Sequence, residues 1–297
     1  MSLTRLQLIE EVVDRFERSE IFFGHGTDNA YDEAMWLIKH VLRLPLEEPL
    51  TGADKFVSEN ELCEIYAVVE QRITQRKPLA YLLNSAWFCG LEFYVDERVI
   101  VPRSPIAELV EQEFAPWLRS MPENILDLCT GSACIAIACA TQFQQAIVHA
   151  TDISIDALAV ADINIGKHGM EKRVKLFQAD VFEGLPETRY DLIVSNPPYV
   201  DVREMAEMPD EYRQEPEMAL AAGSDGLRIV RRMLQEAELY LTDNGILVCE
   251  VGDSEDALQN AYPTVPFIWL EFEFGGHGVF LLHAEDLRKY REELSYV

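Results

Sequence analysis

The N-terminal part of the chain carries apolar residues every three or four positions, the spacing of helices that bury one face. Three helices are expected: one near the N-terminus, one around residues 34–41 and one over Ser58–Gln75. The apolar positions that carry these patterns are Leu6, Ile9, Val12, Val13 and Phe16, then Ala34, Leu37, Ile38 and Val41, then Leu62, Ile65, Val68 and Val69. Proline and glycine residues mark the loops between them. We predict a small helical domain over residues 1–84.

Between Trp87 and Val101 apolar and polar residues alternate instead, with Phe88, Leu91 and Phe93 among the apolar ones. Alternation with a period of two is the pattern of strands. We predict a β-hairpin within residues 85–103 that links the helical domain to the rest of the chain.

The remainder, residues 104–297, alternates short apolar runs with helical patterns. The expected strands lie near Asn124–Cys129, Ala146–Thr151, Val174–Gln178, Asp191–Ser195, Ile246–Glu250 and Val265–Leu270. Strands separated by helices form a largely parallel sheet covered on both faces. The final runs, Trp269–Phe274 and Gly278–His283, read as an antiparallel edge hairpin. We predict an α/β, Rossmann-like domain of seven strands.

The charge balance limits the partners. The 297 residues include 25 Lys and Arg against 52 Asp and Glu, a net charge of −27. Such a surface repels phosphate backbones, and no basic patch stands out, so direct nucleic-acid binding is not expected. No apolar run is long enough for a membrane span, and the N-terminus reads as an amphipathic helix rather than a signal peptide. The acidity favours a basic protein partner; the alternative explanation is that it only keeps the protein soluble.

Cysteines and histidines show no metal-ligand spacing. The six cysteines and six histidines are scattered, so no metal site is expected. The cysteines read as small core residues of a reduced cytoplasmic protein. Glu250, at the end of an expected strand, either lines a cleft or caps the strand.

A candidate cofactor site starts where the first strand of the sheet ends. The strand and the turn after it run from Ile125 to Ile135, with the small residues that let a ligand approach the backbone. Asp127 is placed to bind an amino-acid-like ammonium group. The turn residues expected to contact the ligand are Cys129, Thr130, Gly131, Ser132 and Ala133.

Acidic residues end the next two strands as well. Asp152 is placed to accept the hydroxyls of a ribose, and Asp180 to accept an adenine amino group while Val181 packs on the ring. A single aspartate at a strand end is more often a helix cap. Three in this order on successive strands indicate an adenosine-containing ligand.

The most specific signal is Asn196-Pro197-Pro198-Tyr199, directly after an expected buried strand. The two prolines stiffen the backbone and donate no N–H, so the carbonyls are free to accept. The side-chain oxygen of Asn196 and the carbonyl of Pro197 can then hold the two hydrogens of one NH2 group, and Tyr199 can stack on the planar group that bears it. We predict these four residues to be the catalytic motif.

With these motifs the chain resembles, over nearly its whole length, the protein-glutamine methyltransferases of the HemK type. The resemblance implies S-adenosylmethionine as cofactor, S-adenosylhomocysteine as product and a seven-stranded class I methyltransferase fold. It covers the motifs above, the Trp87–Arg103 hairpin, Glu215 to Leu220 and Asp225 to Leu227. It also implies that the N-terminal domain recognises a protein substrate.

Two departures from the family pattern bear on cofactor and substrate. The cofactor loop usually holds three glycines, whereas this chain keeps only Gly131, between Cys129 and Ala133. The release-factor enzymes usually read Pro-Arg-Pro-Glu-Thr-Glu where this chain has Pro102 to Ala107. That difference, together with Phe22 to Ala30, resembles the subgroup that modifies ribosomal protein L3, which we therefore favour as acceptor over release factors.

The segment after the motif, Asp201 to Gly223, is rich in acid. It holds seven acidic residues and only Arg203 and Arg213 as basic ones. The acidic residues are Asp201, Glu204, Glu207, Asp210, Glu211, Glu215 and Glu217. Our hypothesis is that this loop guides a basic substrate to the cleft; the alternative is a solvated face.

Two rival functions remain open. Nucleic-acid amino-methyltransferases share the four-residue motif, and the altered glycine loop leaves room for a module that binds S-adenosylmethionine without catalysis.

Overall fold

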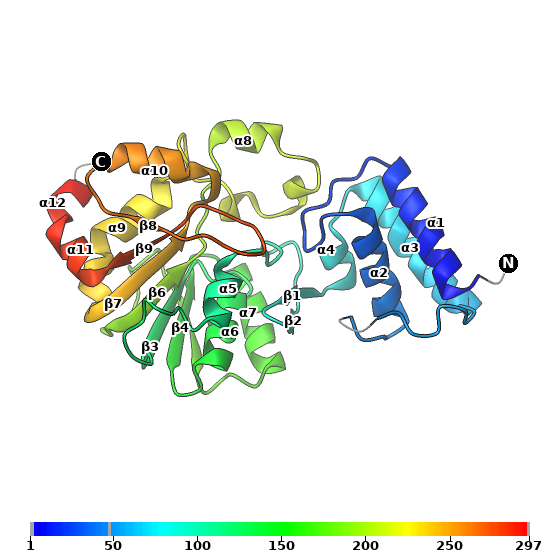
Figure 1. The fold of residues 1–297 in the computed structure, drawn as a ribbon, viewed down its shortest axis with the longest axis horizontal. Helices are drawn as coiled ribbons and strands as arrows, with labels where there is room; N and C mark the ends of the chain where they lie inside the picture. The colour runs from blue at the N-terminus through cyan, green and yellow to red at the C-terminus, as the bar shows by residue number, and fades with distance from the viewer. Residues whose placement is uncertain (1–2, 47–48, 296–297) are drawn as a thin grey trace.

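The computed structural model describes residues 3–46 and 49–295, with a helical part at one end and a sheet flanked by helices at the other (Figure 1). The helical part consists of α1 (Arg5–Arg18), α2 (Ala30–Val41), α3 (Glu59–Gln75) and the short α4 (Leu79–Leu83). Thr4 and Ser58 begin α1 and α3 with capping boxes, which satisfy the free N–H groups of the first turns. The predicted helices are confirmed, but the inward position assigned to Leu6 is wrong, because Leu6 is exposed and Leu8 is buried instead.

The hairpin that follows is shorter than predicted. Strands β1 (Ala86–Phe88) and β2 (Leu91–Phe93) pair antiparallel, and the chain leaves strand geometry at Tyr94. The reason is Asn164 of α7 (Ile155–Lys167), whose side-chain amide accepts from the N–H of Tyr94 and donates to its carbonyl, at 2.7 and 2.9 Å. These bonds replace a strand neighbour and anchor the linking segment to the sheet-containing part. The domain limits at residues 84 and 103 stay a prediction.

Seven strands form the large sheet, in the order β5-β4-β3-β6-β7-β9-β8. They are β3 (Asn124–Leu128), β4 (Ile147–Asp152), β5 (Val174–Gln178), β6 (Tyr190–Ser195), β7 (Leu241–Glu250), β8 (Ile268–Trp269) and β9 (Val279–His283). The first five strands of that order are parallel, and β9 runs antiparallel to both β7 and β8. The predicted Rossmann-like, seven-stranded fold is confirmed.

The predicted edge strand over Trp269–Phe274 is wrong beyond its first residue. β8 ends at Trp269, and the N–H groups of Glu273 and Phe274 donate to the carboxylate of Glu108, at 2.9 and 3.0 Å. Glu108 belongs to α5 (Ile106–Glu111). A side chain of α5 therefore takes the backbone donors that a longer strand would have used.

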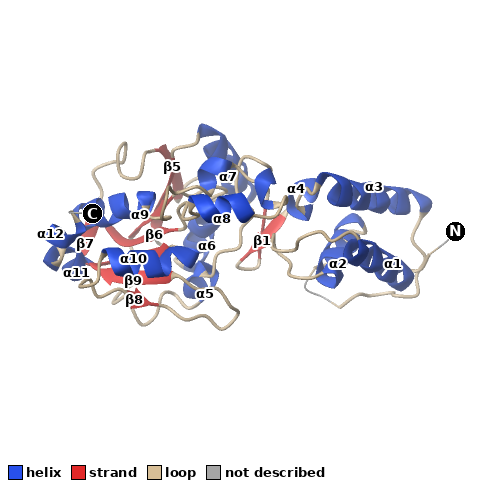
Figure 2. Ribbon diagram, turned by 90° about the horizontal axis from the view of Figure 1, so that it is seen from above, coloured by secondary structure: helices blue, strands red, loops and turns tan. Residues whose placement is uncertain are grey.

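Helices cover both faces of the sheet (Figure 2). One face packs on α5, α6 (Cys134–Gln142) and α7, and the other on α9 (Arg228–Tyr240), α10 (Glu255–Ala261), α11 (Ala284–Lys289) and α12 (Arg291–Leu294). The side chains alternate accordingly: Leu192 and Val194 of β6 face the first layer, and Ile193 faces the second. Four shorter elements, α8 (Val202–Glu207), η1 (Tyr212–Gln214), η2 (Glu217–Ala219) and η3 (Gly252–Ser254), lie in the loops after β6 and β7.

Candidate active site

The predicted catalytic motif lies at the carboxyl end of the parallel strands, directly after β6. Ser195, the last residue of β6, donates its hydroxyl to the carbonyl of Leu128 at the end of β3, at 2.7 Å. The strand order reverses between these two strands, since β4 and β6 lie on opposite sides of β3. Open α/β sheets bind ligands in the crevice at such a reversal.

Six of the predicted cofactor residues meet around one cavity of about 360 Å³, which we call the Asp152 cavity. Among its lining residues are Cys129, Gly131, Asp152, Asp180, Val181 and Asn196. The N–H groups of Gly131 and Ser154 donate to the Asp152 carboxylate at 3.0 and 2.9 Å, which fixes its orientation. Burial raises the pKa of Asp152, and these bonds act against the rise.

The loop between β3 and α6 keeps the backbone shape of a glycine loop without the glycines. Cys129, Gly131 and Ala133 have φ of +59°, +54° and +62°. This left-handed region is natural for glycine and costs residues with a Cβ about 1 kcal/mol or more. The departure at Cys129 and Ala133 therefore preserves the backbone path, at a cost in strain.

Asp127 lies beneath this loop and not on the cavity wall. Its Oδ2 accepts from the Thr130 hydroxyl at 2.5 Å and from the N–H of Ala136 at 3.1 Å, while its Oδ1 is buried without a hydrogen-bond partner. Burial raises the pKa of Asp127 to about 7. Thr130, Ser132 and Ala133 are also buried, so these four predicted residues support the cavity from behind.

The far end of the Asp152 cavity holds a strained residue and an ion pair. Val181 has φ +57°, which is rare for a β-branched residue and clusters at functional sites. Asp180 accepts from Arg232 of α9 at 2.6 Å, and Arg232 lines the same cavity. Sequence reasoning missed Arg232, because no local pattern connects α9 with the end of β5.

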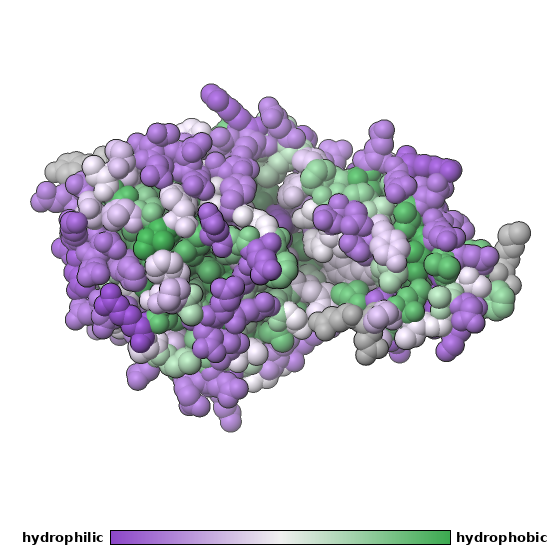
Figure 3. All heavy atoms as spheres, viewed as in Figure 1, coloured by the Kyte–Doolittle hydropathy of each residue, from purple (hydrophilic) through white to green (hydrophobic). Residues whose placement is uncertain are grey.

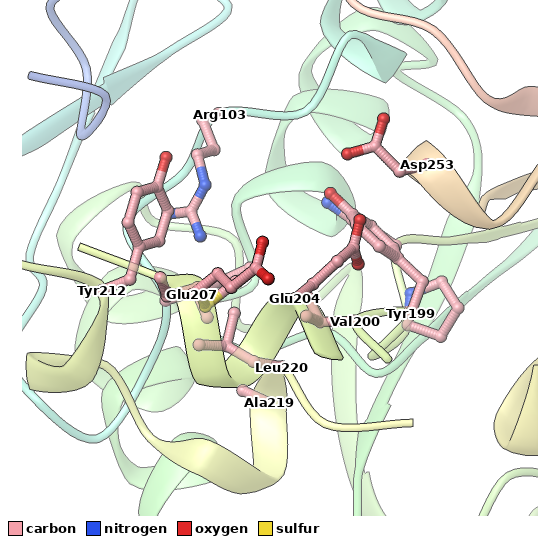
Figure 4. Close-up of a pocket in the computed structure, with 13 residues that line it drawn as sticks. Arg103, Tyr199, Val200, Glu204, Glu207, Tyr212, Ala219, Leu220 and Asp253 are labelled. Atoms are coloured by element: carbon pink, nitrogen blue, oxygen red, sulfur yellow. The ribbon is translucent and has the colours of Figure 1, made fainter. Parts of the chain in front are cut away.

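The motif also borders a second cavity of about 360 Å³, the Tyr199 cavity. Its lining includes Asn196, Pro197, Tyr199, Arg103, Tyr212, Glu204, Glu207 and Asp253. Figure 4 shows Arg103 and Tyr212 on one side of this cavity and Tyr199 and Asp253 on the other, with Glu204 between them. Of the motif, Pro198 lines only the Asp152 cavity, whereas Asn196 lines both.

Tyr199 is held by contacts on three sides. Its hydroxyl donates to Oε1 of Glu250 at 2.9 Å, its carbonyl accepts from Ser254 at 2.9 Å, and its ring packs against Gly252. Glu250 in turn accepts from the Ser104 hydroxyl at 2.5 Å. Burial raises the pKa of both Tyr199 and Glu250.

Our hypothesis that the acidic loop guides a basic substrate needs correction for two of its acidic residues, because they do not face solvent. Glu211 and Glu215 are buried and accept hydrogen bonds from Arg72 and Arg103, respectively. Both reach partners distant in sequence, so the pattern of the loop could not reveal their role. Glu204 and Glu207 do line the Tyr199 cavity, where burial and the nearby Asp253 raise the pKa of Glu204. Only this part of the acidic loop can meet a substrate there.

Within the described residues, no group of three or more His, Cys, Asp or Glu side chains is arranged to hold a metal ion. In the same part of the chain, no helix is long and apolar enough to cross a membrane.

Comparison with known proteins decides the family. Residues 7–83 match the PrmC N-terminal domain and residues 112–211 the Methyltransferase small domain. The ribosomal protein uL3 glutamine methyltransferase of Neisseria gonorrhoeae is 49% identical over 277 residues, which cover 93% of this chain and 92% of that protein. The protein of the same name from Francisella tularensis is 45% identical over 284 residues, covering 94% and 90%. The chain belongs to the family of uL3 glutamine methyltransferases.

Membership in the uL3 glutamine methyltransferase family confirms the predicted HemK-type resemblance and the prediction of a methyltransferase. A crystal structure of a methyltransferase from Pyrococcus furiosus is similar with a TM-score of 0.48 at 18% identity, covering 76% of this chain and 99% of that one. The family assignment rests on the two sequence relatives.

Proposed function

We propose that this protein transfers a methyl group from S-adenosylmethionine to the side-chain amide nitrogen of a glutamine in ribosomal protein uL3 (L3). The observation that carries the proposal is the position of Asn196, which lines both the Asp152 cavity and the Tyr199 cavity. A methyl donor in the first cavity and an amide in the second would meet at this side chain.

The residues of the Asp152 cavity fit the parts of S-adenosylmethionine, which supplies a methyl group on a positively charged sulfur. Asp152, fixed by two backbone N–H groups, suits the ribose hydroxyls. Asp180 suits the adenine amino group, and Val181 packs against the ring. The unpartnered Oδ1 of Asp127 suits the ammonium group. The further proposed cofactor-binding residues are Cys129, Gly131 and Asn196 on the cavity wall, with Thr130, Ser132 and Ala133 of the loop directly behind it.

The catalytic motif would prepare a poor nucleophile. An amide nitrogen shares its lone pair with its carbonyl, and acceptors for both of its hydrogens return electron density to the nitrogen and aim it. The side-chain oxygen of Asn196 and the carbonyl of Pro197 are the proposed acceptors, with Pro198 keeping that backbone rigid. Tyr199 packs against the amide. Orientation and fixed dipoles supply most of the rate, and the proton that the nitrogen loses leaves to solvent.

The proposed acceptor is a basic protein. The relatives named above are uL3 glutamine methyltransferases, and the Tyr199 cavity presents Glu204, Glu207 and Asp253. A net charge of −27 favours a basic ribosomal protein and disfavours a nucleic-acid base as acceptor. We place the reaction in the cytoplasm, where ribosomal proteins are made and the six free cysteines stay reduced.

The substitution Asn196→Ala tests the position of Asn196 as the meeting point. We expect kcat to fall roughly 10²–10³-fold, as for loss of one preorganised polar contact in other enzymes. The Kd for S-adenosylmethionine, measured by calorimetry, should rise much less than kcat falls, because Asn196 is only one of several proposed cofactor contacts. Asn260→Ala, at an exposed position of α10, is the control. Equal losses of binding and transfer would show that Asn196 serves the cofactor or the fold instead.

A further inference from the structure

Arg103 stands at the boundary of two cavities. It lines the Tyr199 cavity and also a larger one of about 710 Å³, the Trp87 cavity, where the helical part meets the sheet-containing part. Figure 3 shows the molecular surface hollowed between these two parts. The Trp87 cavity is lined by Asp28, Tyr31 and Asp32 on the helical side, and by Trp87 and Arg103 on the other. Its volume is sufficient for several residues of a polypeptide.

The guanidinium of Arg103 is held in a fixed position. Its Nη1 and Nη2 donate to the two carboxylate oxygens of Glu215 at 2.6 and 2.7 Å, and Nη1 also donates to the carbonyl of Val101 at 3.0 Å. The group lies over the Tyr212 ring at 5.2 Å from its centre. Glu215 is itself buried and accepts from the N–H of Val101 at 2.9 Å. This pairing leaves the arginine little freedom to move.

Two donors of this arginine remain unused. A guanidinium has five N–H groups, and three of them make the bonds to Glu215 and Val101. Among the described residues, the Nε–H and one N–H of Nη2 have no acceptor. The side chain is 24% exposed, toward the cavities that it lines. A fixed donor pair of this kind binds a ligand oxygen without losing side-chain entropy.

The surroundings decide which oxygen fits. The Glu215 carboxylate already neutralises Arg103, and Glu204 and Glu207 line the same cavity, so an anionic ligand would be repelled. A neutral carbonyl is not repelled. The carbonyl of the reacting amide is a poor choice, because a cationic donor there would draw the lone pair away from the nitrogen. A main-chain carbonyl near the reacting residue is neutral and does not share electrons with the reacting nitrogen, so it is the oxygen that fits Arg103.

We propose that Arg103 binds a main-chain carbonyl of the acceptor protein where its polypeptide passes from the Tyr199 cavity into the Trp87 cavity. The inference rests on the proposed function, because the Tyr199 cavity must receive the glutamine. The same segment then lies against Trp87 and Tyr31, which are 37% and 55% exposed, and its basic side chains face Asp28 and Asp32. The occupant is therefore a basic, extended segment of the acceptor next to the methylated glutamine.

The test compares Arg103→Gln with the double variant Arg103→Gln/Glu215→Gln, using uL3 as acceptor. The double variant removes the carboxylate that the single variant leaves buried without its partner. We expect both to raise the KM for uL3 about tenfold or more, the loss expected for hydrogen bonds from a charged group. The Kd for S-adenosylmethionine should not change. Arg213→Gln is the control for loss of one positive charge, because Arg213 is exposed and lies in the loop that carries Glu215.

Three outcomes would overturn the inference. An unchanged KM in both Arg103 variants means that the arginine does not bind the acceptor. Recovery of the wild-type KM in the double variant means that Arg103 only neutralises Glu215. Absence of methyl transfer to uL3 by the wild-type protein overturns the proposed function and this inference together, which separates that failure from the first two.

Discussion

The hydroxyl of Tyr199 donates a hydrogen bond of 2.9 Å to Glu250, and so connects the catalytic motif after β6 to the end of β7. Glu250 is buried and accepts a second bond from Ser104, which precedes α5. The motif is thus fixed by neighbours from two other segments. Glu250 is not among the residues that line the two cavities beside the motif, so it takes neither role considered from the sequence and supports the cleft through Tyr199 instead.

The two functions of Tyr199 can be separated by substitution. Tyr199→Phe keeps the ring and removes the hydroxyl, which leaves Glu250 with one fewer donor. We expect a loss of about 1–3 kcal/mol in the free energy of unfolding, with the KM for the acceptor nearly unchanged. Tyr199→Ala should also raise the KM, because the packing surface is lost. Denaturant unfolding and initial rates measure both effects, and an equal KM for the two variants would contradict the role of the ring.

Asp127 predicts a pH dependence of cofactor binding. Burial raises its pKa to about 7, so in the free protein the carboxyl gains a proton as the pH falls below 7. An ammonium group binds the carboxylate, and affinity for S-adenosylmethionine should therefore fall below pH 7, by up to about tenfold per pH unit. Binding should release protons in that range, as calorimetry in buffers of different ionisation enthalpy detects. In Asp127→Asn the affinity should be low and independent of pH between 5 and 7. A wild-type affinity that is constant over this range would exclude the assigned role.

A buried charge cluster ties the helical part to the loop after β6. Arg72, 1% exposed, donates to Glu33 at 2.6 Å, to Glu211 at 3.2 Å and to the carbonyl of Phe22 at 2.6 Å. Arg72→Met leaves Glu33 buried without its arginine and Glu211 with only the longer contact to Arg76, at 3.6 Å, so we expect the free energy of unfolding to fall by roughly 3–5 kcal/mol. Arg18→Met, which breaks an exposed pair with Asp14, should cost less than about 1 kcal/mol. Similar losses for the two variants would show that the cluster does not stabilise the fold.

The acidic wall of the Tyr199 cavity predicts a salt-dependent KM. Glu204→Gln/Glu207→Gln should raise the KM for uL3 and flatten its dependence on salt, because attraction of a basic partner is screened by ions. Glutamine retains the oxygen with which Glu204 caps α8. The control Glu17→Gln/Glu64→Gln removes the same charge from exposed positions in α1 and α3. If both pairs change the KM equally, the effect belongs to net charge and not to the cavity.

Elements set by local patterns were predictable from the sequence. The helix that begins after Ser58 and the largely parallel sheet follow from periodicity, capping residues and the alternation of strands with helices. The strand-end positions of three residues also predict that they meet at one edge of the sheet, namely Asp152, Asp180 and Asn196. The residues of the proposed site could therefore be predicted from short segments of the sequence.

What the sequence did not reveal depends on contacts between distant residues. Glu211 and Glu215 look like members of a solvated acidic loop, yet their arginine partners lie 139 and 112 residues away. The strand expected to extend to Phe274 ends early because Glu108, 166 residues before it, takes its N–H group. Such partners become visible only after the fold has brought the segments together.

The acceptor and the methylated atom can be identified by mapping the transferred label. The purified protein is incubated with methyl-labelled S-adenosylmethionine and, separately, with unmodified uL3 and an unmodified release factor, and labelled residues are located by mass spectrometry. We expect label on the side-chain amide of a glutamine in uL3 and none on the release factor. Label on the release factor alone would keep the chemistry and contradict the acceptor. Absence of label on either, with cofactor binding intact, would contradict the proposed function.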